Sequence, residues 1–182
     1  MRQQESITHG QYQIVEEINK VLTRVTRINK NLLLLAKMEN NQFQKFKYIN
    51  ISTIAIEVQL NLAEHFSAKK MQLTTAIDAG IILEGNATLI EILLNNLLLN
   101  TIKHSDIQAD IYLIVTKKGI VVSNSGNHIL FEDKLYKRFA SLTKTSAGSG
   151  LGLAIIKQVC EVHHWKIEYS FDKNQHNFSV SF

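Results

Sequence analysis

The chain has 182 residues, of which 45% are hydrophobic and 20% are charged, as in an ordinary soluble globular protein. Its formal net charge of +4 is mild, so it is compatible with a polyanionic ligand without indicating one. The single cysteine, Cys160, excludes an internal disulfide framework, and no apolar run is long enough to span a bilayer.

The first segment of the chain, residues 1–42, is dominated by one predicted helix. Its apolar residues recur at intervals of four and three positions, at Ile14, Ile18, Val21, Val25, Ile28, Leu32 and Leu35. This 3.5-residue repeat is typical of a coiled-coil or helical-bundle seam, which a lone helix would leave in water. The seam could pack on the chain's own domain, but the strict heptad spacing favours a bundle with a second chain.

The remaining residues, 43–182, are predicted to form a separate domain. The pattern indicates a short extended segment at 43–49, helices at 51–66, 87–102 and 151–162, and strands at 71–77, 111–115, 119–123, 166–171 and 177–182. Helices segregated from hairpin-linked strands predict an α+β fold. We expect a two-layer sandwich in which helices cover one face of a mixed sheet, preceded by the long heptad helix.

The otherwise apolar helix at 87–102 carries one polar face. Asn96, Asn100 and Lys103, just beyond its end, lie at positions i, i+4 and i+7 and share that face. Asparagine is disfavoured in helix interiors and in cores, so buried amides at this spacing need polar partners. Amide oxygens can coordinate Mg²⁺ and lysine can meet a phosphate, but two asparagines that bond only to nearby backbone would give the same pattern.

Two glycine-containing turns follow. The apolar strand at 119–123 runs into Asn124 and Gly126, where a flat ligand could approach the backbone, although a simple strand-ending turn explains this segment better on its own. Glycines at 148, 150 and 152 lead directly into a helix, whose first N–H groups suit a phosphate. A dinucleotide-binding fold is not indicated, because its preceding strand and its acidic strand end are both missing.

The three patterns occur in the order NLLLNTIKHS, NSGN and GSGLGLAI. Together they resemble the N, G1 and G2 boxes of histidine kinase ATP-binding domains, whose superfamily includes gyrase, heat-shock chaperone and mismatch-repair ATPases. The resemblance extends from about Phe43 to Phe182, and residues 135–139 fall where the family has its F box. It implies a protein-histidine kinase that binds ATP and Mg²⁺ and transfers the γ-phosphoryl group to a histidine, for relay to an aspartate of a response regulator.

The resemblance implies a role for each candidate residue. Asn100 would coordinate the Mg²⁺ that bridges the phosphates, with Asn96 beside it. Lys103 would contact a phosphate, and His104 would lie near the ribose or the phosphates. Gly126 would let adenine approach its turn, Lys144 would be a lid cation near the γ-phosphate, and the glycine loop would cradle the phosphates. The complete set of cofactor-binding candidates is Asn96, Asn100, Lys103, His104, Asn124, Gly126, Lys144, Gly148, Gly150, Leu151 and Gly152, of which Asn100 is the metal ligand.

The G1 box departs from the family pattern in two ways. The family usually has an aspartate at the position of Asn124, where it accepts a hydrogen bond from the adenine amino group. The amide oxygen of Asn124 can still accept that bond, but a neutral acceptor could make binding weaker or less selective. The second G1 glycine has no match, because Asn127 and His128 follow Gly126. Residues 127–147 would form a lid anchored by Phe139.

The heptad helix resembles the second helix of the family's dimerisation hairpin, which implies a homodimer formed through it. The first helix of that hairpin would carry a phosphate-accepting histidine with an acidic neighbour and a nearby proline. The chain has no proline and His9 has no acidic neighbour, so we expect the acceptor to lie outside this fragment, which alone would not autophosphorylate. The histidines at 65, 128, 163, 164 and 176 are expected at the surface or at interfaces, and Cys160 in the core.

The resemblance also implies a cytoplasmic domain of a parent protein that is anchored in the inner membrane. A response regulator receiver domain is the expected partner, with no nucleic acid and no direct membrane contact of this fragment. Two alternatives remain open. One is a degenerate nucleotide-binding or scaffolding dimerisation module without kinase activity, which Asn124 keeps open. The other is a stand-alone ATPase or anti-sigma-factor serine kinase, which the heptad helix disfavours.

Overall fold

The computed structural model describes residues 9–43, 45–131, 135–140 and 149–182. Its helices are α1 (His9–Glu39), α2 (Ile51–Asn61), α3 (Ala63–Ala68), α4 (Ala87–His104) and α6 (Gly152–His163). Its strands are β1 (Lys47–Asn50), β2 (Gln72–Ile77), β3 (Ile82–Gly85), β4 (Asp110–Thr116), β5 (Gly119–Ser125), β6 (Lys166–Asp172) and β7 (Gln175–Ser181). Among these described helices, none combines the length and the apolar character needed to cross a bilayer.

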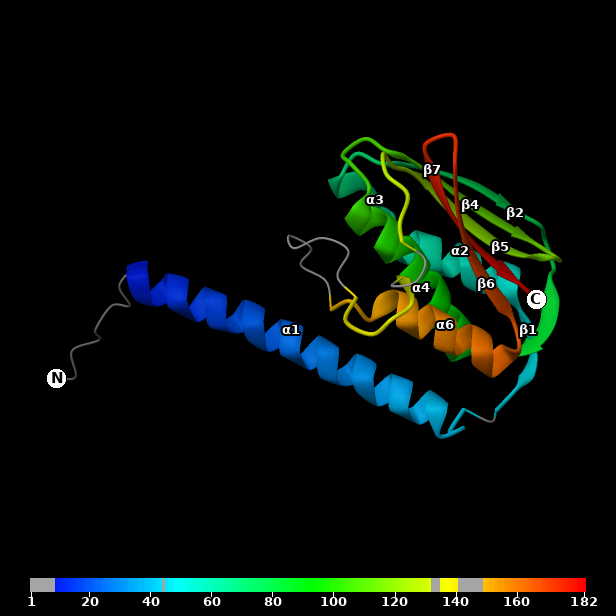
Figure 1. Ribbon diagram of the computed structural model, residues 1–182, viewed down its shortest axis with the longest axis horizontal. Helices are drawn as coiled ribbons and strands as arrows, with labels where there is room; N and C mark the ends of the chain where they lie inside the picture. Colours follow the sequence, from blue (N-terminus) through cyan, green and yellow to red (C-terminus); the bar gives the residue numbers. More distant parts are fainter. Residues whose placement is uncertain (1–8, 44, 132–134, 141–148) are drawn as a thin grey trace.

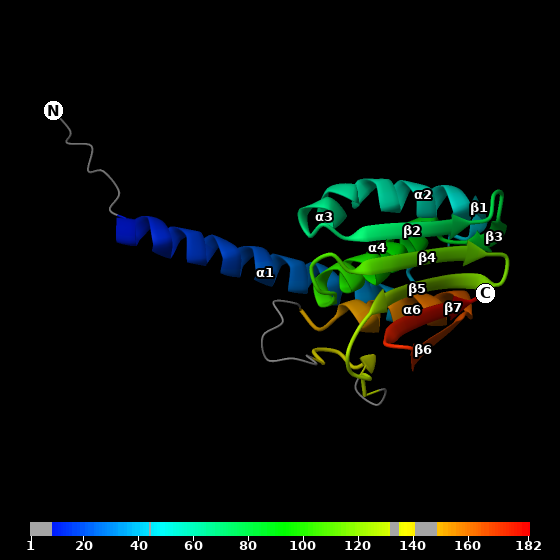
Figure 2. The ribbon, with the colours of Figure 1, turned by 90° about the horizontal axis from the view of Figure 1, so that it is seen from above.

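A mixed sheet forms one layer of the domain, with its strands in the order β2-β4-β5-β7-β6. β2 pairs parallel with β4, and the other neighbouring strands pair antiparallel. β1 and β3 form a separate antiparallel pair. Helices α2, α4 and α6 cover one face of the large sheet, as both ribbon views show (Figure 1 and Figure 2). The predicted α+β sandwich is therefore confirmed.

Helix α4 lies at the centre of the helical layer, between α2 and α6. It begins after Asn86, whose side chain accepts a hydrogen bond from the backbone N–H of Leu89 at 3.2 Å. Its most buried residues, each at most 2% exposed, are Leu89, Ile90, Leu93, Leu94, Leu97 and Leu98. Because burying one such side chain stabilises a fold by roughly 1.5–3 kcal/mol, these residues fix the position of α4 and the direction of its polar face.

The structure differs from the sequence pattern at two short elements. The helix predicted over 51–66 is two helices, because the chain bends at Leu62, which ends α2 and precedes α3. Strand β3 has no periodic signal, since four residues are too few to establish an alternation. The extended segment expected near 43–49 corresponds to β1, where Ile49 pairs with Leu83 of β3.

Helix α1 runs beside α6 and projects beyond the domain (Figure 1). Near its C-terminal end, Leu35 and Met38 are each 1% exposed, and Ile28 and Leu32 pack partly against the core. The other seam residues are each more than half exposed in this chain: Ile14, Ile18, Val21 and Val25. The heptad stripe therefore packs on the chain's own domain in its second half, and its first half is left in solvent.

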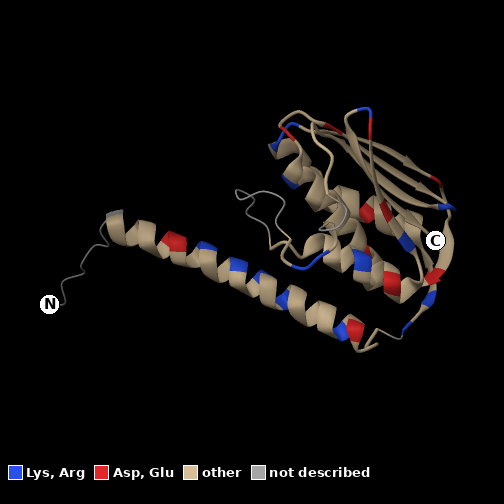
Figure 3. Cartoon of the chain, in the orientation of Figure 1, with Lys and Arg blue, Asp and Glu red and all other residues tan. Residues whose placement is uncertain are grey.

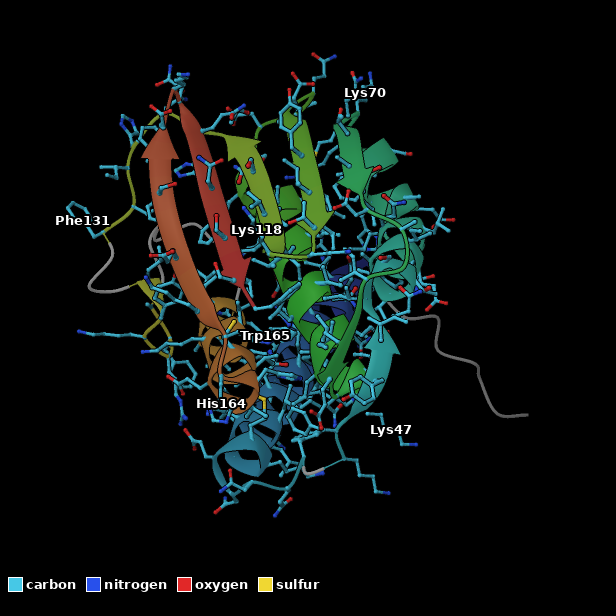
Figure 4. All side chains as sticks on the ribbon, turned by 90° about the vertical axis from the view of Figure 1, so that its right-hand side faces the viewer. Lys47, Lys70, Lys118, Phe131, His164 and Trp165 are labelled. Carbon is cyan, nitrogen blue, oxygen red and sulfur yellow. The ribbon has the colours of Figure 1, made fainter. Side chains whose placement is uncertain are left out.

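His163 lies in the interior, so the expectation that it is a surface residue is wrong: it is 7% exposed. Its Nε2 accepts a hydrogen bond from the backbone N–H of Asn86 at 3.1 Å, and its Nδ1 donates to the carbonyl of Val159 at 2.8 Å. The ring packs against Phe46 and Trp165, with centroids 5.0 and 4.5 Å away. Trp165 follows the end of α6 (Figure 4). His163 thus joins α6 to the first residue before α4.

We expect His163 to destabilise the fold as the pH falls below about 6.5, the ordinary pKa of histidine. Burial lowers the pKa of His163 in the folded chain. At higher pH the ring is neutral in both states. Below about 6.5, the unfolded chain binds a proton that the folded chain does not, so the free energy of unfolding falls.

Urea denaturation between about pH 7.5 and pH 5.5 measures this effect. A His163→Gln variant has no titrating group at this position and should show a weaker dependence on pH. An equal pH dependence in both proteins would contradict the role of His163.

Candidate functional site

A cavity of about 470 Å³ lies between α4, the end of β5, the start of α6 and α1. This volume is within the range of about 300–1,000 Å³ that ligand pockets occupy. The structure brings most of the candidate residues to its wall from separate parts of the sequence. They are Asn96, Asn100, Lys103, His104, Asn124, Gly126, Gly150 and Gly152. Leu151 is buried beside them and does not line the cavity, and Lys144 and Gly148 lie outside the described residues.

The polar face of α4 forms one wall of the cavity. Asn96 donates from Nδ2 to the carbonyl of Ile92 at 2.8 Å, and its Oδ1 faces the start of α6, where a Cβ atom on Gly152 would lie 3.3 Å away. Asn100 is half-buried and forms no side-chain hydrogen bond within the described part of the chain. The amide of Asn100 lines the cavity and can both donate and accept hydrogen bonds, so it is suited to a ligand there.

Positive charge gathers where α4 ends next to α1. Burial lowers the pKa of Lys103, and the charges of Arg27 and Arg24 on α1 lower it further. Burial also lowers the pKa of His104, with a further contribution from nearby positive groups. Asp106 supplies a negative charge among the lining residues. The arginines of α1 thus repel the ammonium group of Lys103, and a bound anion would relieve that repulsion.

The last residues of β5 form another part of the wall. Asn124 is 4% exposed and donates from Nδ2 to the carbonyl of Ser125 at 2.9 Å, which leaves its Oδ1 as a hydrogen-bond acceptor. The backbone N–H of Gly126 donates to the carbonyl of Asn174 at 2.9 Å. This bond fixes the turn after β5 to the β6–β7 hairpin.

His176 lines the cavity, whereas the sequence pattern predicts a position at the surface or at an interface. It pairs in register with Asn124, so both side chains lie on the same face of the sheet. Its Nδ1 lies 2.8 Å from Tyr169 Oη, which accepts a hydrogen bond from the backbone N–H of Leu130 at 3.1 Å. A Cβ atom on Gly126 would lie 1.9 Å from His176 Nε2, so the ring occupies the space that a side chain there would need.

The glycine loop leads into α6, whose first N–H groups form a site that favours negative charge. Gly150 has φ +66°, and a Cβ atom on it would lie 2.8 Å from the backbone of Phe139, so glycine is needed here. The backbone N–H of Leu151 donates to Ser149 Oγ at 3.3 Å. Phe139 is 57% exposed, and its backbone lies beside Gly150 of the loop.

Residues 85–182 match the family model described as Histidine kinase-, DNA gyrase B-, and HSP90-like ATPase. All three candidate motifs lie within that match. Heme sensor protein HssS of Staphylococcus aureus (strain Newman) is 31% identical over 166 residues, which cover 87% of this chain. The match covers 36% of HssS, so the chain spans little more than a third of that relative.

Solved structures have a similar fold. Acinetobacter baumannii histidine kinase AdeS matches with a TM-score of 0.71 and 18% identity, over 97% of this chain and 85% of that chain. The catalytic domain of histidine kinase ThkA, in a nucleotide-free form, matches with a TM-score of 0.63 and 25% identity. That match covers 75% of this chain and 96% of the ThkA chain.

We expect Gly126→Ala to lower the free energy of unfolding by roughly 1–3 kcal/mol, because the new Cβ meets the His176 ring. The cost should largely vanish in a protein that also carries His176→Ala, where the ring is absent. Urea denaturation of the wild type, both single variants and the double variant measures this coupling. Additive effects of the two substitutions would show that the glycine and the ring are not in contact.

Proposed function

This chain belongs to the histidine kinase-, DNA gyrase B- and HSP90-like ATPase family and contains the ATP-binding catalytic domain of a sensor histidine kinase, and we propose that it binds ATP with Mg²⁺ in the cavity between α4 and α6. The observation that carries this proposal is the convergence of three sequence motifs on one cavity. The motifs are the asparagines of α4, the turn after β5 and the glycines before α6. In the sequence they are separated by tens of residues.

Adenine would lie at the end of the cavity formed by β5 and β7. The Oδ1 of Asn124 is the acceptor for its amino group, and Gly126 allows the base to approach the backbone. His176, which also lines this part of the wall, would lie next to the base. The support for this orientation is that the arginine and lysine among the described lining residues, Arg27 and Lys103, lie on α1 and α4, away from β5 and β7.

The phosphates would lie between α4 and the start of α6. Asn100 would supply an oxygen ligand to Mg²⁺ with Asn96 beside it, and Lys103 and His104 would approach the phosphates or the ribose. Backbone N–H groups of residues 148–152, with Lys144 as a lid cation, complete the proposed phosphate site. The free amide of Asn100 fits a hard cation, whose remaining ligands would be phosphate oxygens and water. Bound Mg²⁺ supplies neutralisation of the negative charge on the phosphates.

The proposed reaction is transfer of the γ-phosphoryl group to a histidine. The bond from the γ-phosphorus to the bridging oxygen of ATP breaks, a bond to an imidazole nitrogen forms, and ADP leaves. Such catalysis depends mainly on positioning and on charge neutralisation, which are the roles that the cavity wall can perform. We further propose that His9 is not the acceptor, because no acidic residue follows it, and that the phosphoryl group passes on to an aspartate of a response regulator.

The exposed half of the α1 seam supports a homodimer formed through this helix. Seam residues such as Ile14 and Val25 are 59% and 55% exposed in the single chain, and a second copy of the helix would cover them. A receiver domain as partner and a membrane-anchored parent protein with this domain in the cytoplasm are further parts of the proposal. They concern a longer protein, because the chain spans 36% of its relative HssS.

Asn124 favours one competing function, a degenerate module that no longer transfers phosphate. A neutral amide replaces the family's charged acceptor at this position, and a weaker hydrogen bond to adenine follows. A degenerate module that still binds nucleotide would bind ATP without transferring phosphate, whereas a pure scaffold would show no measurable Mg²⁺-dependent ATP binding. Calorimetry that detects no binding at millimolar ATP would favour the scaffold.

We expect Asn100→Ala to weaken ATP binding in the presence of Mg²⁺ by roughly tenfold or more, because a ligand of the cation is lost. The matched control is Asn95→Ala on the same helix. Asn95 donates to the carbonyl of Glu91 at 3.0 Å and does not line the cavity, so its loss should leave the affinity nearly unchanged. Isothermal titration calorimetry with and without Mg²⁺ measures both. Equal affinities of the two variants for ATP with Mg²⁺ would show that Asn100 does not contact the bound nucleotide or its cation.

We expect Asn124→Asp to strengthen ATP binding by roughly fivefold, since a carboxylate accepts a stronger hydrogen bond than an amide. Inosine triphosphate lacks the 6-amino group of adenine and is the control ligand, so its affinity should not increase. A competition assay with a fluorescent nucleotide compares the two ligands. The same gain for both would mean that position 124 does not recognise the amino group.

A further inference from the structure

Helix α1 contributes side chains to the cavity that the ATP-binding motifs build. Arg27 and Asn31, one turn apart on α1, line the cavity together with Asn100 and Lys103 of α4. The helix is held there because Leu35, one turn beyond Asn31, is buried in the core of the domain at 1% exposure. In this structure α1 is therefore one wall of the site as well as an arm that extends from the domain.

A second contact joins the end of α1 to a segment that contributes to the cavity wall. Glu39, the last residue of α1, forms an ion pair with Arg138. Arg138 belongs to the described segment 135–140, whose residues Leu135 and Ala140 also line the cavity. Two separate contacts, one apolar and one charged, thus connect α1 to the walls of the site.

The charge of α1 next to the cavity is positive. Between Glu17 and Glu39 the charged residues of α1 are all basic, which Figure 3 shows as a succession of blue bands. They are Lys20, Arg24, Arg27, Lys30 and Lys37. Burial lowers the pKa of Lys103 on α4, and the charges of Arg27 and Arg24 lower it further. Cations from two different elements therefore face each other across one cavity, which is an arrangement that favours a polyanion between them.

We propose that Arg27 of α1 contacts the polyphosphate of bound ATP, so that the nucleotide holds α1 against the catalytic domain. The inference rests on the ATP binding proposed above and adds a residue from outside the three motifs. A guanidinium group can donate parallel hydrogen bonds to two phosphate oxygens, which a lysine cannot do. Because Arg27 and Lys103 belong to different helices, phosphates that contact both also join the two helices.

This contact couples the nucleotide to the position of α1. A ligand that binds more tightly when α1 is docked stabilises the docked arrangement by the same free energy. Transfer of the γ-phosphoryl group leaves ADP, which carries less negative charge than ATP. The nucleotide therefore holds α1 less firmly after the reaction than before it.

Calorimetry on the full chain with ATP and Mg²⁺ tests the contact. Arg27→Gln should weaken ATP binding by roughly tenfold and leave adenosine binding unchanged, because adenosine has no phosphate. Arg27→Lys should restore part of the loss. Lys30→Gln is the matched control: it removes one charge from the same helix at an exposed position that does not line the cavity, and its effect should be roughly twofold or less.

The outcomes separate this inference from the proposed function. Equal ATP affinities of Arg27→Gln and Lys30→Gln, or an equal loss for adenosine, would overturn the Arg27 contact alone. Absence of ATP binding by the wild type would overturn both. Hydrogen exchange of the amides in residues 20–31 provides a second measurement: ATP with Mg²⁺ should slow it in the wild type and not in Arg27→Gln. Exchange that ATP does not slow would refute the link to α1.

Discussion

Helix α4 can be buried on several sides because its charged and amide side chains lie away from its buried face, where the hydroxyl of Thr101 donates to the carbonyl of Leu97. Leucine and isoleucine side chains pack against α2, α6 and the sheet, and burying the amide of Asn100 in that apolar packing would be costly because it has no hydrogen-bond partner there. The cavity lies along the face that carries Asn100, where the end of β5 and the start of α6 meet α4. The hydrogen bond from Asn86 to His163 fixes the start of α4 to the end of α6, so the two helices at the site are held by an interior contact as well as by packing.

Features that depend on spacing within one segment were predictable from the sequence. The interval of four between Asn96 and Asn100 places both on one helix face whatever the surrounding fold, and glycines directly before a helix expose its first N–H groups in any context. The same holds for the hairpins and for the α+β class, because alternation and turn residues act over a few positions. Short β3 and the bend at Leu62 carry no such local signal.

Features that depend on contacts between distant segments were not predictable in this way. His176 reaches the cavity because β7 pairs with β5 in the register that sets it beside Asn124, and a single sequence does not reveal that register. His163 and His164 are neighbours in sequence, yet His163 is buried while His164 ends α6 with φ 59°. Arg27 lines the cavity only because the second half of the heptad seam packs on the chain's own domain. The strict heptad repeat favours packing against a second chain instead.

The way in which α1 is fastened has a mechanical consequence. This helix has 31 residues and is held by the domain near Leu35, so a tilt of α1 would have its pivot close to the cavity that we propose for the nucleotide. At 1.5 Å per residue, the far end at His9 lies roughly 40 Å from Leu35, and a tilt of about 10° would move it by roughly 7 Å. Residue 27 is only about 12 Å from the same pivot, so the tilt would move it by roughly 2 Å. A large displacement at the free end thus reaches the proposed phosphate site as a small one, comparable to the making or breaking of a single hydrogen bond.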